Sequence, residues 1–581
     1  MQNHTPPPDA PRVPTPAAGT GRTAVRTHPV RTVTVRILAV LGALIVLAAC
    51  WASLAPPAHA AERGSGASAG SSGSPAAPAT LVTVDSGALQ GVATPTGVEF
   101  RGVPYAAAPV GDLRWTPPQP VPAWAGARDA TAYSPVCPQA PPSPNGSSED
   151  CLYLNVTVPS DTASASASRS GLPVIVWIHG GGFELGEGAD YDASDLASKG
   201  AIVVTINYRL GLLGFLSHPA LADGTGASGN YGLMDQQAAL RWVQHNIGRF
   251  GGDAGRVTIA GQSAGGLSVG MQLASPGAKG LFQRAVIQSG AFAPLQKPLA
   301  QAEEEGRASA TAVGCADQTA ECLRQVPVDV LVANQPLSIT PGVVDGAVLK
   351  TSVGVAIATG RFNRVPIING VNTQEERIFV PLGVSVTKGA TVIGPGQVDA
   401  SNYTSVIASS LGVGERTAAT IAAAYPLSKY ASPTHAFTVL NSDANFSCPT
   451  FALDAAAAAW VPTFAYEFND AEAPQLYVPD TLGPPPAATH QSELAYLFGQ
   501  PNAPLAGSLT ADQEQLASTM QEAWVRFAAT GSPSSPDASW PRFDLRTQVL
   551  SLDDPAPSVE RGFAVDHKCA LWAGVALFGS R

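Results

Sequence analysis

The chain has 581 residues, of which 45% are hydrophobic and 13% are charged, so it can bury a large core and wholesale disorder is not expected. Its formal net charge is −11, and residues 1–60 carry a net +4, which leaves −15 for the remainder. An acidic remainder has no general electrostatic attraction to nucleic acid, so we expect no nucleic-acid partner.

The first 60 residues have the pattern of an export signal. Several arginines precede an uninterrupted apolar run, residues 37–49, and an Ala-His-Ala cleavage pattern follows at 58–60. Residues 61–79 are rich in Gly, Ser, Ala and Pro, which predicts a flexible linker. The sequence therefore predicts a signal peptide over 1–60 and a protein that is released outside the cell.

Two alternatives to release remain. The stretch from Ile37 to Ala55 is nearly long enough to span a membrane. The sequence Leu-Ala-Ala-Cys at 47–50 resembles a bacterial lipobox, which would lipidate Cys50 and anchor the protein to the outer face of the membrane. We expect no stable membrane insertion of the mature domain in either case.

Six cysteines follow the leader, and an even number in an exported chain predicts disulfides. Their spacing suggests two local loops, Cys137–Cys151 and Cys315–Cys322, which leaves the pair Cys448–Cys569. No cysteine or histidine cluster has the spacing of metal ligands. We therefore expect neither a metal nor another cofactor.

Apolar runs with polar or glycine boundaries predict strands in chain order at 81–84, 91–100, 172–178, 201–208, 257–260, 285–288, 365–369, 464–468 and 549–552. Helical spacing occurs at 235–247, 267–274 and 516–529. Strands that alternate with helices predict an α/β protein whose mostly parallel sheet is covered on both faces. Ligands bind such sheets at the carboxyl ends of the strands.

The stretch after the predicted strand 257–260 fits the pattern G-x-S-x-G, Gly261 to Gly265. Between a strand and a helix this pattern predicts a nucleophile elbow, a tight turn that pushes the Ser263 hydroxyl outward. The alternative is an ordinary connection in which Ser263 caps the helix. The strand–helix context and the motifs below favour a catalytic serine.

A run of glycines follows the predicted strand that ends at Ile178, in the sequence His179-Gly-Gly-Gly-Phe183. Glycines allow backbone N–H groups to approach a substrate closely, and such donors stabilise the negative charge that develops on an attacked carbonyl oxygen. We expect Gly181 and Gly182, together with Ala264 after the nucleophile, to form an oxyanion hole. The alternative is a flexible glycine-rich turn.

In hydrolases with a nucleophile elbow of this kind, the catalytic serine comes first along the chain, then the acid, then the histidine. His490 follows a Gly/Pro-rich loop and can act as the base, whereas a structural role is expected for His435. The acid must lie between Ser263 and His490 at the end of a strand. Glu375 and Glu376 both fit from their position after the strand 365–369, and Asp345 is the outside candidate.

These residues belong to longer motifs that resemble one family, the type-B carboxylesterases. This branch of the α/β hydrolases includes p-nitrobenzyl esterases, cholinesterases and rugosa-type lipases. The likeness covers residues 80 to 578, which we expect to form a single catalytic domain with helical insertions over the active site. Its motifs are F-R-G-V-P-Y-A at 100–106, G-D-L-R-W at 111–115, S-E-D-C-L-Y-L-N at 148–155, the block 229–253, and W-V-R-F-A-A-T-G-S-P at 524–533.

The resemblance implies a triad of Ser263, His490 and Glu375, supports the three disulfides, and implies a salt bridge between Arg114 and Glu149. The sequence departs from the family at two places. Gln374 and Glu376 stand where the family has Asp and Gly around the acid, so Glu375 is chosen over Glu376 by register alone. In addition, Gln262 replaces the usual Glu before the nucleophile, which removes a negative charge from the floor of the pocket.

The expected function is that of a secreted serine carboxylester hydrolase acting on a small-molecule ester. Cholinesterases hold a cation on a Trp in the first disulfide loop, whereas residues 138–150 contain no Trp. In the lipases this loop is a long lid, but here only thirteen residues separate Cys137 from Cys151. We therefore expect short-chain or aryl esters. The alternatives are a secreted lipase, a non-catalytic cholinesterase-like binding module, and a hydrolase of amides or carbamates.

Overall fold

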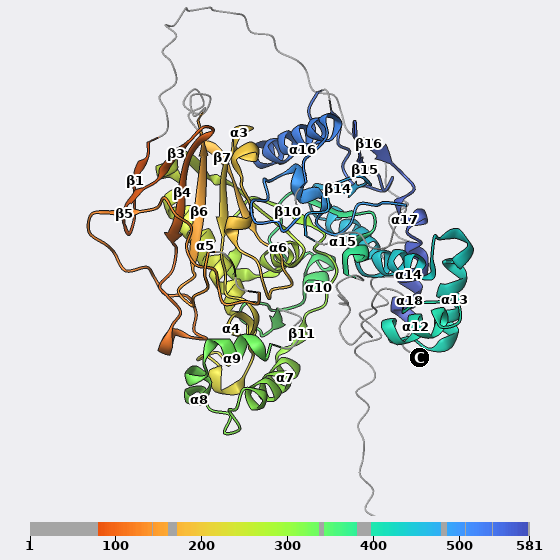
Figure 1. Ribbon diagram of the computed structural model, residues 1–581, viewed down its shortest axis with the longest axis horizontal. Coiled ribbons are helices and arrows are strands. Elements are labelled where there is room, and N and C mark those ends of the chain that lie inside the picture. The colour runs from red at the N-terminus through yellow and green to blue at the C-terminus, as the bar shows by residue number, and fades with distance from the viewer. Residues whose placement is uncertain are drawn as a thin grey trace, which may run out of the picture. The chain divides into compact units, whose positions relative to one another are not determined.

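Among the residues that the computed structural model describes, eleven strands form one sheet, in the order β16-β15-β14-β13-β10-β9-β7-β8-β6-β4-β3 (Figure 1). The strands are β3 (Val92–Thr94), β4 (Gly97–Pro104), β6 (Tyr153–Pro159), β7 (Leu172–Ile178), β8 (Ile202–Ile206), β9 (Gly252–Gln262), β10 (Arg284–Gln288), β13 (Ile367–Asn372), β14 (Thr463–Phe468), β15 (Val549–Leu552) and β16 (Ser558–Glu560). Two small sheets accompany it, β1 (Leu81–Val84) with β2 (Gly87–Gln90) and β5 (Ala127–Asp129), and β11 (Lys297–Pro298) with β12 (Val343–Val344).

The structure describes residues 79–141, 143, 145–160, 171–335, 342–379, 397–477, 485–505, 507–536 and 538–578. All of them lie in the second of the two units into which the chain divides, Met1–Ala67 and Ser68–Arg581. The predicted signal peptide, the lipobox at Cys50 and nearly all of the predicted linker therefore lie outside the described residues.

The central strands of the large sheet are parallel, as the sequence predicts. Every pairing from β8 across to β15 is parallel, and antiparallel pairings occur only toward the two edges. The predicted strand 91–100 is in fact a hairpin, β3 and β4, because Pro95 and Thr96 form a turn at which Pro lacks a donor for the ladder. Parallel pairing places Gln262, Gln288 and Gly370 at the same level of the sheet.

Side chains of alternate residues leave β7 toward opposite faces of the sheet, where two separate cores bury them. Val174, Val176 and Ile178 pack with helices α5 (Tyr231–Asn246), α6 (Ala264–Ala274) and α10 (Val353–Ala358). Ile175 and Trp177 pack with α3 (Ser194–Ser198) and α16 (Ala511–Thr530) on the other face (Figure 1). Each such aliphatic side chain contributes roughly 1.5–3 kcal/mol by leaving water, so the sheet is fixed from both sides.

Two further groups of helices are inserted between the strands (Figure 1). One group packs around Trp115 and Leu331 and consists of α4 (Gly211–Phe215), α7 (Leu299–Ala312), α8 (Ala320–Gln325) and α9 (Val328–Ala333). The other packs around Tyr425 and Trp572 and contains α12 (Tyr403–Leu411), α13 (Glu415–Ala424), α14 (Pro433–Ser442), α15 (Cys448–Ala458), α17 (Phe563–Asp566) and α18 (Cys569–Phe578). A π-helical turn, Asp443–Ser447, joins α14 to α15.

All three expected disulfides are present, with Cα–Cα separations of 5.0 Å for Cys137–Cys151, 5.7 Å for Cys315–Cys322 and 5.1 Å for Cys448–Cys569. The expected ion pair is present too. Arg114 donates from Nε and Nη2 to the two oxygens of Glu149 at 2.7 and 2.6 Å, a bidentate geometry.

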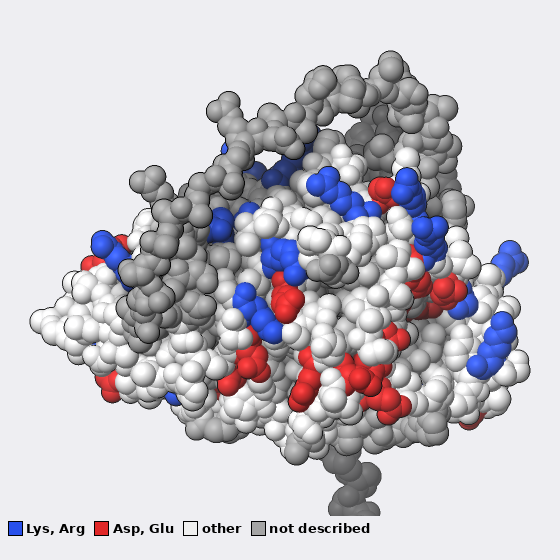
Figure 2. Space-filling view, turned by 90° about the horizontal axis from the view of Figure 1, so that it is seen from above, with Lys and Arg blue, Asp and Glu red and all other residues white. Residues whose placement is uncertain are grey.

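Charged side chains are sparse on the face of the unit shown in Figure 2, where basic and acidic groups are scattered among uncharged ones. None of the helices in the described ranges has both the length and the apolar character needed to cross a membrane.

Candidate active site

The turn between β9 and α6 holds Ser263 in a strained conformation. Its φ of 57° and ψ of −122° lie in a region that residues with a Cβ seldom adopt. The flanking glycines permit this turn, because a Cβ at Gly261 would come within 2.6 Å of the carbonyl carbon of Gly265, and one at Gly265 would overlap the carbonyl oxygen of Ile178. The Ser263 side chain makes no capping hydrogen bond to α6. The capping interpretation therefore finds no support, and the hydroxyl is available for chemistry.

The glycine loop after β7 lies directly against this turn. A Cβ at Gly180 would lie 3.2 Å from the Cβ of Ser263. The next two residues have φ of 98° at Gly181 and 65° at Gly182, a left-handed backbone that favours glycine. Neither of their amides donates to another described residue. Ala264 is the first residue of α6, where an amide has no acceptor within the helix.

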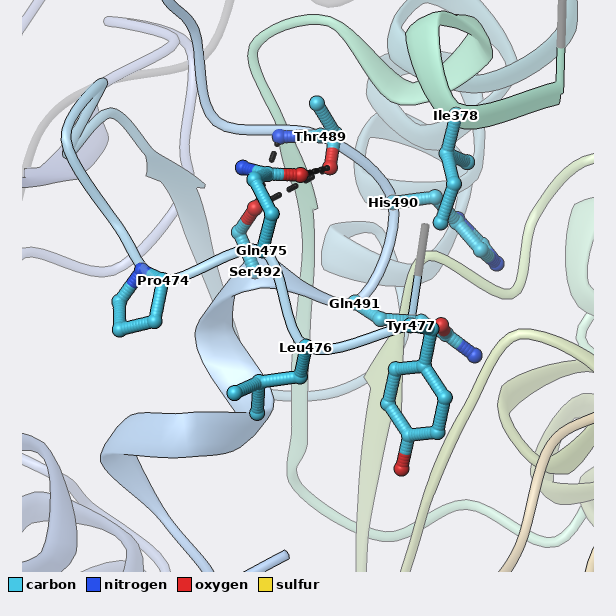
Figure 3. A pocket seen from close by; sticks show the side chains of 9 residues that line it. All are labelled: Ile378, Pro474, Gln475, Leu476, Tyr477, Thr489, His490, Gln491 and Ser492. Atoms are coloured by element: carbon cyan, nitrogen blue, oxygen red, sulfur yellow. Dashed lines mark hydrogen bonds between the residues drawn. The ribbon is translucent and has the colours of Figure 1, made fainter. Parts of the chain in front are cut away.

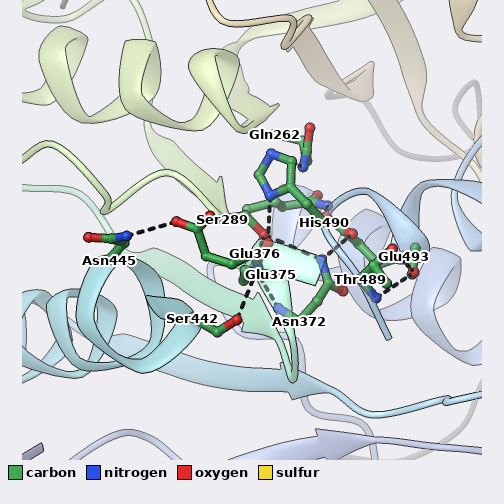
Figure 4. A network of polar contacts seen from close by, with 12 residues as sticks. Gln262, Ser289, Asn372, Glu375, Glu376, Ser442, Asn445, Thr489, His490 and Glu493 are labelled. Carbon is green, nitrogen blue, oxygen red and sulfur yellow. Dashed lines mark hydrogen bonds and ion pairs between the residues drawn. The ribbon is translucent and has the colours of Figure 1, made fainter. Parts of the chain in front are cut away.

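His490 and Glu375 form a buried pair (Figure 4). His490 Nδ1 lies 2.5 Å from Glu375 Oε2. The other carboxylate oxygen, Oε1, accepts from Ser289 Oγ at 2.6 Å and from the backbone N–H of Asn372 at 2.7 Å. An ionised carboxylate only accepts hydrogen bonds, so Nδ1 is the donor in this pair. The imidazole is thereby fixed in the tautomer that a general base requires.

The free ring nitrogen of His490 points to the residue before the serine. Gln262 Nε2 lies 3.2 Å from His490 Nε2, across 228 positions of sequence. The loop that carries His490 is held by its own contacts, since the backbone N–H of Thr489 donates to Ser492 Oγ at 2.9 Å. The structure thus brings the predicted base to the end of β9, beside the turn that holds Ser263.

The other candidates from the sequence face elsewhere. Glu376 accepts from Asn445 Nδ2 at 2.7 Å and points away from His490 in Figure 4. Burial raises the pKa of Glu376 to about 7. Asp345 accepts from Asn230 Nδ2 at 2.8 Å and from two amides of its own loop. Of the three acids that sequence order allowed, Glu375 alone is hydrogen-bonded to His490 within the described chain.

A second layer of polar residues, which the sequence analysis did not identify, supports the pair. Glu493 accepts from Gln288 Nε2 at 3.1 Å and from Asn372 Nδ2 at 2.8 Å. Burial and the charge of Glu375 raise the pKa of Glu493. Gln288 is held in turn by Trp524 Nε1 at 3.0 Å, from α16. The sequence contained one signal for this layer: the last residue of β10 and the residue after it are Gln-Ser (288–289), as they are for β9 (262–263).

His490 has two aromatic neighbours and also lines a small pocket. Its ring centroid lies 5.1 Å from that of Phe379 and 5.3 Å from that of Phe446. In this pocket the side chains of Thr489, Ser492 and Gln475 are linked by hydrogen bonds (Figure 3). Its full lining is Ile378, Pro474, Gln475, Leu476, Tyr477, Thr489, His490, Gln491 and Ser492.

Comparisons with known proteins agree with this geometry. Residues 78–572 match the model of the carboxylesterase family. The chain is 37% identical over 500 residues to the fumonisin B1 esterase of Sphingopyxis macrogoltabida, covering 82% of this chain and 86% of that protein. It is 35% identical over 505 residues to the para-nitrobenzyl esterase of Bacillus subtilis, covering 83% and 96%.

Solved structures show the same relationship. A PNB esterase superposes with a TM-score of 0.70 at 33% identity, over 85% of this chain and 99% of that one, which confirms the α/β-hydrolase fold. A thermophilic PNB esterase superposes equally well, with a TM-score of 0.70 at 31% identity. The chain therefore belongs to the carboxylesterase family and is a carboxylic ester hydrolase.

Proposed function

We propose that this hydrolase cleaves esters through an acyl-enzyme on Ser263, with His490 as the general base and Glu375 as the acid that orients it. The observation that carries the proposal is the buried pair of His490 and Glu375, 2.5 Å apart, whose free ring nitrogen faces the residue before Ser263. The strained backbone of Ser263 supports the same role, because strain of this kind is retained where function requires it.

The chemistry follows from the positions of these groups. Ser263 Oγ attacks the ester carbonyl carbon while its proton passes to His490 Nε2, and the carbonyl oxygen becomes an oxyanion. The amides of Gly181, Gly182 and Ala264 stabilise that oxyanion, at about 3 kcal/mol for each donor. The alcohol leaves with the proton from Nε2, and water then releases the acid by the same steps. Glu375 keeps Nδ1 protonated and stabilises the transient imidazolium.

The loop closed by Cys137–Cys151 supports small soluble substrates. Gln139 pairs with the backbone of Gly186, donating to its oxygen at 3.1 Å and accepting from its N–H at 2.8 Å. Glu187 accepts from Asn145 at 2.9 Å and from Ser143. A short loop held by four hydrogen bonds does not act as a large mobile lid. The aromatic side chains beside His490 would contact an aryl or short acyl group, so we propose short-chain and aryl esters as substrates.

Active-site labelling tests the proposed nucleophile. A fluorophosphonate probe should label the wild-type protein on the peptide that contains Ser263, and Ser263→Ala should abolish both labelling and hydrolysis of p-nitrophenyl acetate without changing the unfolding transition. Ser409→Ala, at an exposed serine of α12, is the matched control and should label normally. A protein that does not label, and so behaves as a binding module, or a Ser263→Ala variant that keeps its turnover, would contradict the proposal.

A substrate series tests the proposed specificity. The kcat/KM for p-nitrophenyl esters should be highest for short acyl chains and fall as the chain lengthens. A rate that rises sharply above the solubility limit of a triglyceride would instead identify a lipase with interfacial activation.

We also propose that the protein is exported. The three disulfides in the described residues support an oxidising compartment. Mass spectrometry of the mature N-terminus tests this proposal. A chain recovered from the medium that begins at Ala61 indicates release, whereas a diacylglyceryl Cys50 in the membrane fraction indicates the lipoprotein.

A further inference from the structure

We propose that Gln262 is a positioning residue for His490. Its side-chain amide can hydrogen-bond to the ring in both protonation states, and because the amide is neutral, the ring has a single carboxylate partner. This inference rests on the proposed triad and concerns a residue that does not itself react. Gln262 ends strand β9, is fully buried, and donates from Nε2 toward His490 Nε2 at 3.2 Å.

The resting state requires a donor at this place. Since the N–H of His490 Nδ1 donates a hydrogen bond to Glu375, Nε2 has a lone pair that needs a hydrogen-bond donor when no substrate is bound. Gln262 supplies that donor from a side chain whose backbone is fixed in the parallel ladder opposite Gln288. The ring is therefore held on both nitrogens without being charged.

In the reacting state a hydrogen-bond donor at the same place is unfavourable. Once Ser263 has given its proton to Nε2, the ring donates from both nitrogens, and the NH2 group of Gln262 would oppose the new N–H. Gln262 Oε1 is buried and has no hydrogen-bond partner among the described residues. Rotation of the terminal amide by half a turn presents this oxygen to the imidazolium and breaks no existing hydrogen bond of Oε1. A buried amide oxygen without a partner normally carries a cost, and this role accounts for its presence.

The neutrality of Gln262 matters as much as its hydrogen bonds. The charged or titratable groups that face His490 are Glu375, which contacts Nδ1, and Glu376 and Glu493, which act through space. The other ring neighbours, Phe379 and Phe446, are uncharged. A carboxylate at position 262 would place the ring between two carboxylates and favour a proton on Nε2 before substrate binds. That proton would block the base, and the active form would be reached only at higher pH.

The pH profile of kcat/KM distinguishes this role from a structural one. Gln262→Glu should move the acid limb upward by about one pH unit or more and lower kcat/KM at about pH 6 by roughly tenfold or more, with recovery toward pH 9. Gln262→Met, which has a similar volume but neither a donor nor a charge, should leave the acid limb in place and lower kcat roughly tenfold with little change in KM. Gln515→Glu, at an exposed site of α16, adds the same charge on the surface and should reproduce the wild-type profile.

The two proposals fail in different ways. Loss of labelling at Ser263 in the wild type would overturn the triad. A protein that labels at Ser263, but whose Gln262→Glu variant keeps the wild-type profile and rate, would overturn the role of Gln262 alone. The rate of fluorophosphonate labelling at about pH 6 and pH 9 gives a second reading that does not depend on deacylation. Equal unfolding midpoints for the Gln262 variants and the wild type would exclude a folding defect.

Discussion

Among the hydrogen bonds between described residues, two buried histidines have carboxylate partners, and the difference between them separates the proposed catalytic base from a structural cation. His490 has one carboxylate partner, Glu375 at Nδ1, and an amide at Nε2. His567 has a carboxylate at each nitrogen, with Asp443 Oδ1 2.5 Å from Nδ1 and Glu467 Oε1 2.8 Å from Nε2. Burial alone would lower the pKa of His567, but Glu467 and Asp443 outweigh it and raise the pKa to about 10.

The number of carboxylates around each ring explains what it can do. His567 donates from both nitrogens, so it has no lone pair with which to accept a proton. Its surroundings are structural: Tyr425 donates to Asp443 at 2.6 Å, and Trp572 donates to Tyr425 at 2.8 Å, next to the disulfide Cys448–Cys569. His490 differs in having an amide, Gln262, at Nε2 in place of a second carboxylate.

The largest effect is expected from Glu375→Gln. The amide can no longer hold the proton on Nδ1 by charge, so kcat should fall on the order of 10³–10⁴-fold while the unfolding transition changes little. Glu376→Gln is the matched control on the adjacent residue, and it should retain kcat within about threefold because Glu376 faces Asn445. If Glu376→Gln lost more kcat than Glu375→Gln, Glu375 would be the wrong residue for the acid.

His567→Gln should have the opposite profile. It removes a buried cation from between two carboxylates, which should lower the free energy of unfolding by about 3–5 kcal/mol while kcat stays within about twofold. Urea unfolding and steady-state kinetics measure the two effects. His490→Gln is the reciprocal control: it should abolish hydrolysis and change the unfolding free energy far less. Comparable stability losses in both variants would remove the distinction between the two histidines.

The raised pKa of His567 also predicts how stability depends on pH. The folded value of about 10 lies above the ordinary value of 6.5, so its contribution is fully present below 6.5 and is lost as the pH rises through about 10. Between about pH 7 and pH 9.5 the wild type should lose about 2–3 kcal/mol that His567→Gln does not lose. Denaturant titrations across this range measure the difference. Parallel curves for the two proteins would contradict the assigned cation.

The smallest effect is expected from the buried carboxyl of Glu376. Its folded pKa of about 7 lies above the ordinary value of 4.5, so folding favours the protonated form and stability is lost as the pH rises between these values. Glu376→Gln keeps the hydrogen bond from Asn445 without the charge. It should match the wild type near pH 4.5 and exceed it by about 1–2 kcal/mol at pH 8. Thermal unfolding at both pH values tests this, and a variant less stable than the wild type at pH 8 would contradict it.

Local motifs made much of the fold and part of the site predictable. Short apolar runs predict the parallel strands and the helices that follow them, and glycines predict the sharp turns at Ser263 and at the glycine loop. The choice between Glu375 and Glu376 was different, because both follow β13. They lie in a 3₁₀ turn, Glu375–Ile378, which sends adjacent side chains in directions about 120° apart. Only the three-dimensional register shows which of them meets His490.

The contacts that support His490 and His567 could not be predicted from the sequence, for a physical reason. Asn372 and Glu493 are 121 positions apart, and His567 meets Asp443 across 124 positions. Hydrogen bonds of this kind depend on the side-by-side order of β9, β10, β13 and β14 and on the path of the loops between them, which no local pattern encodes. The sequence therefore indicated the proposed reactive groups but not the residues that contact them.

The order of the strands has a consequence for how the protein acquires its activity. Ser263, His490 and Glu375 come from segments that are far apart along the chain. The contact between His490 and Gln262 joins residues that are 228 positions apart, so it requires the chain between them to be folded. Contacts of such long range form slowly, because the ends of large loops must first be brought together. After dilution from denaturant, esterase activity should thus return later than the circular dichroism signal of the secondary structure. The recovery of activity would then report the final stage of refolding.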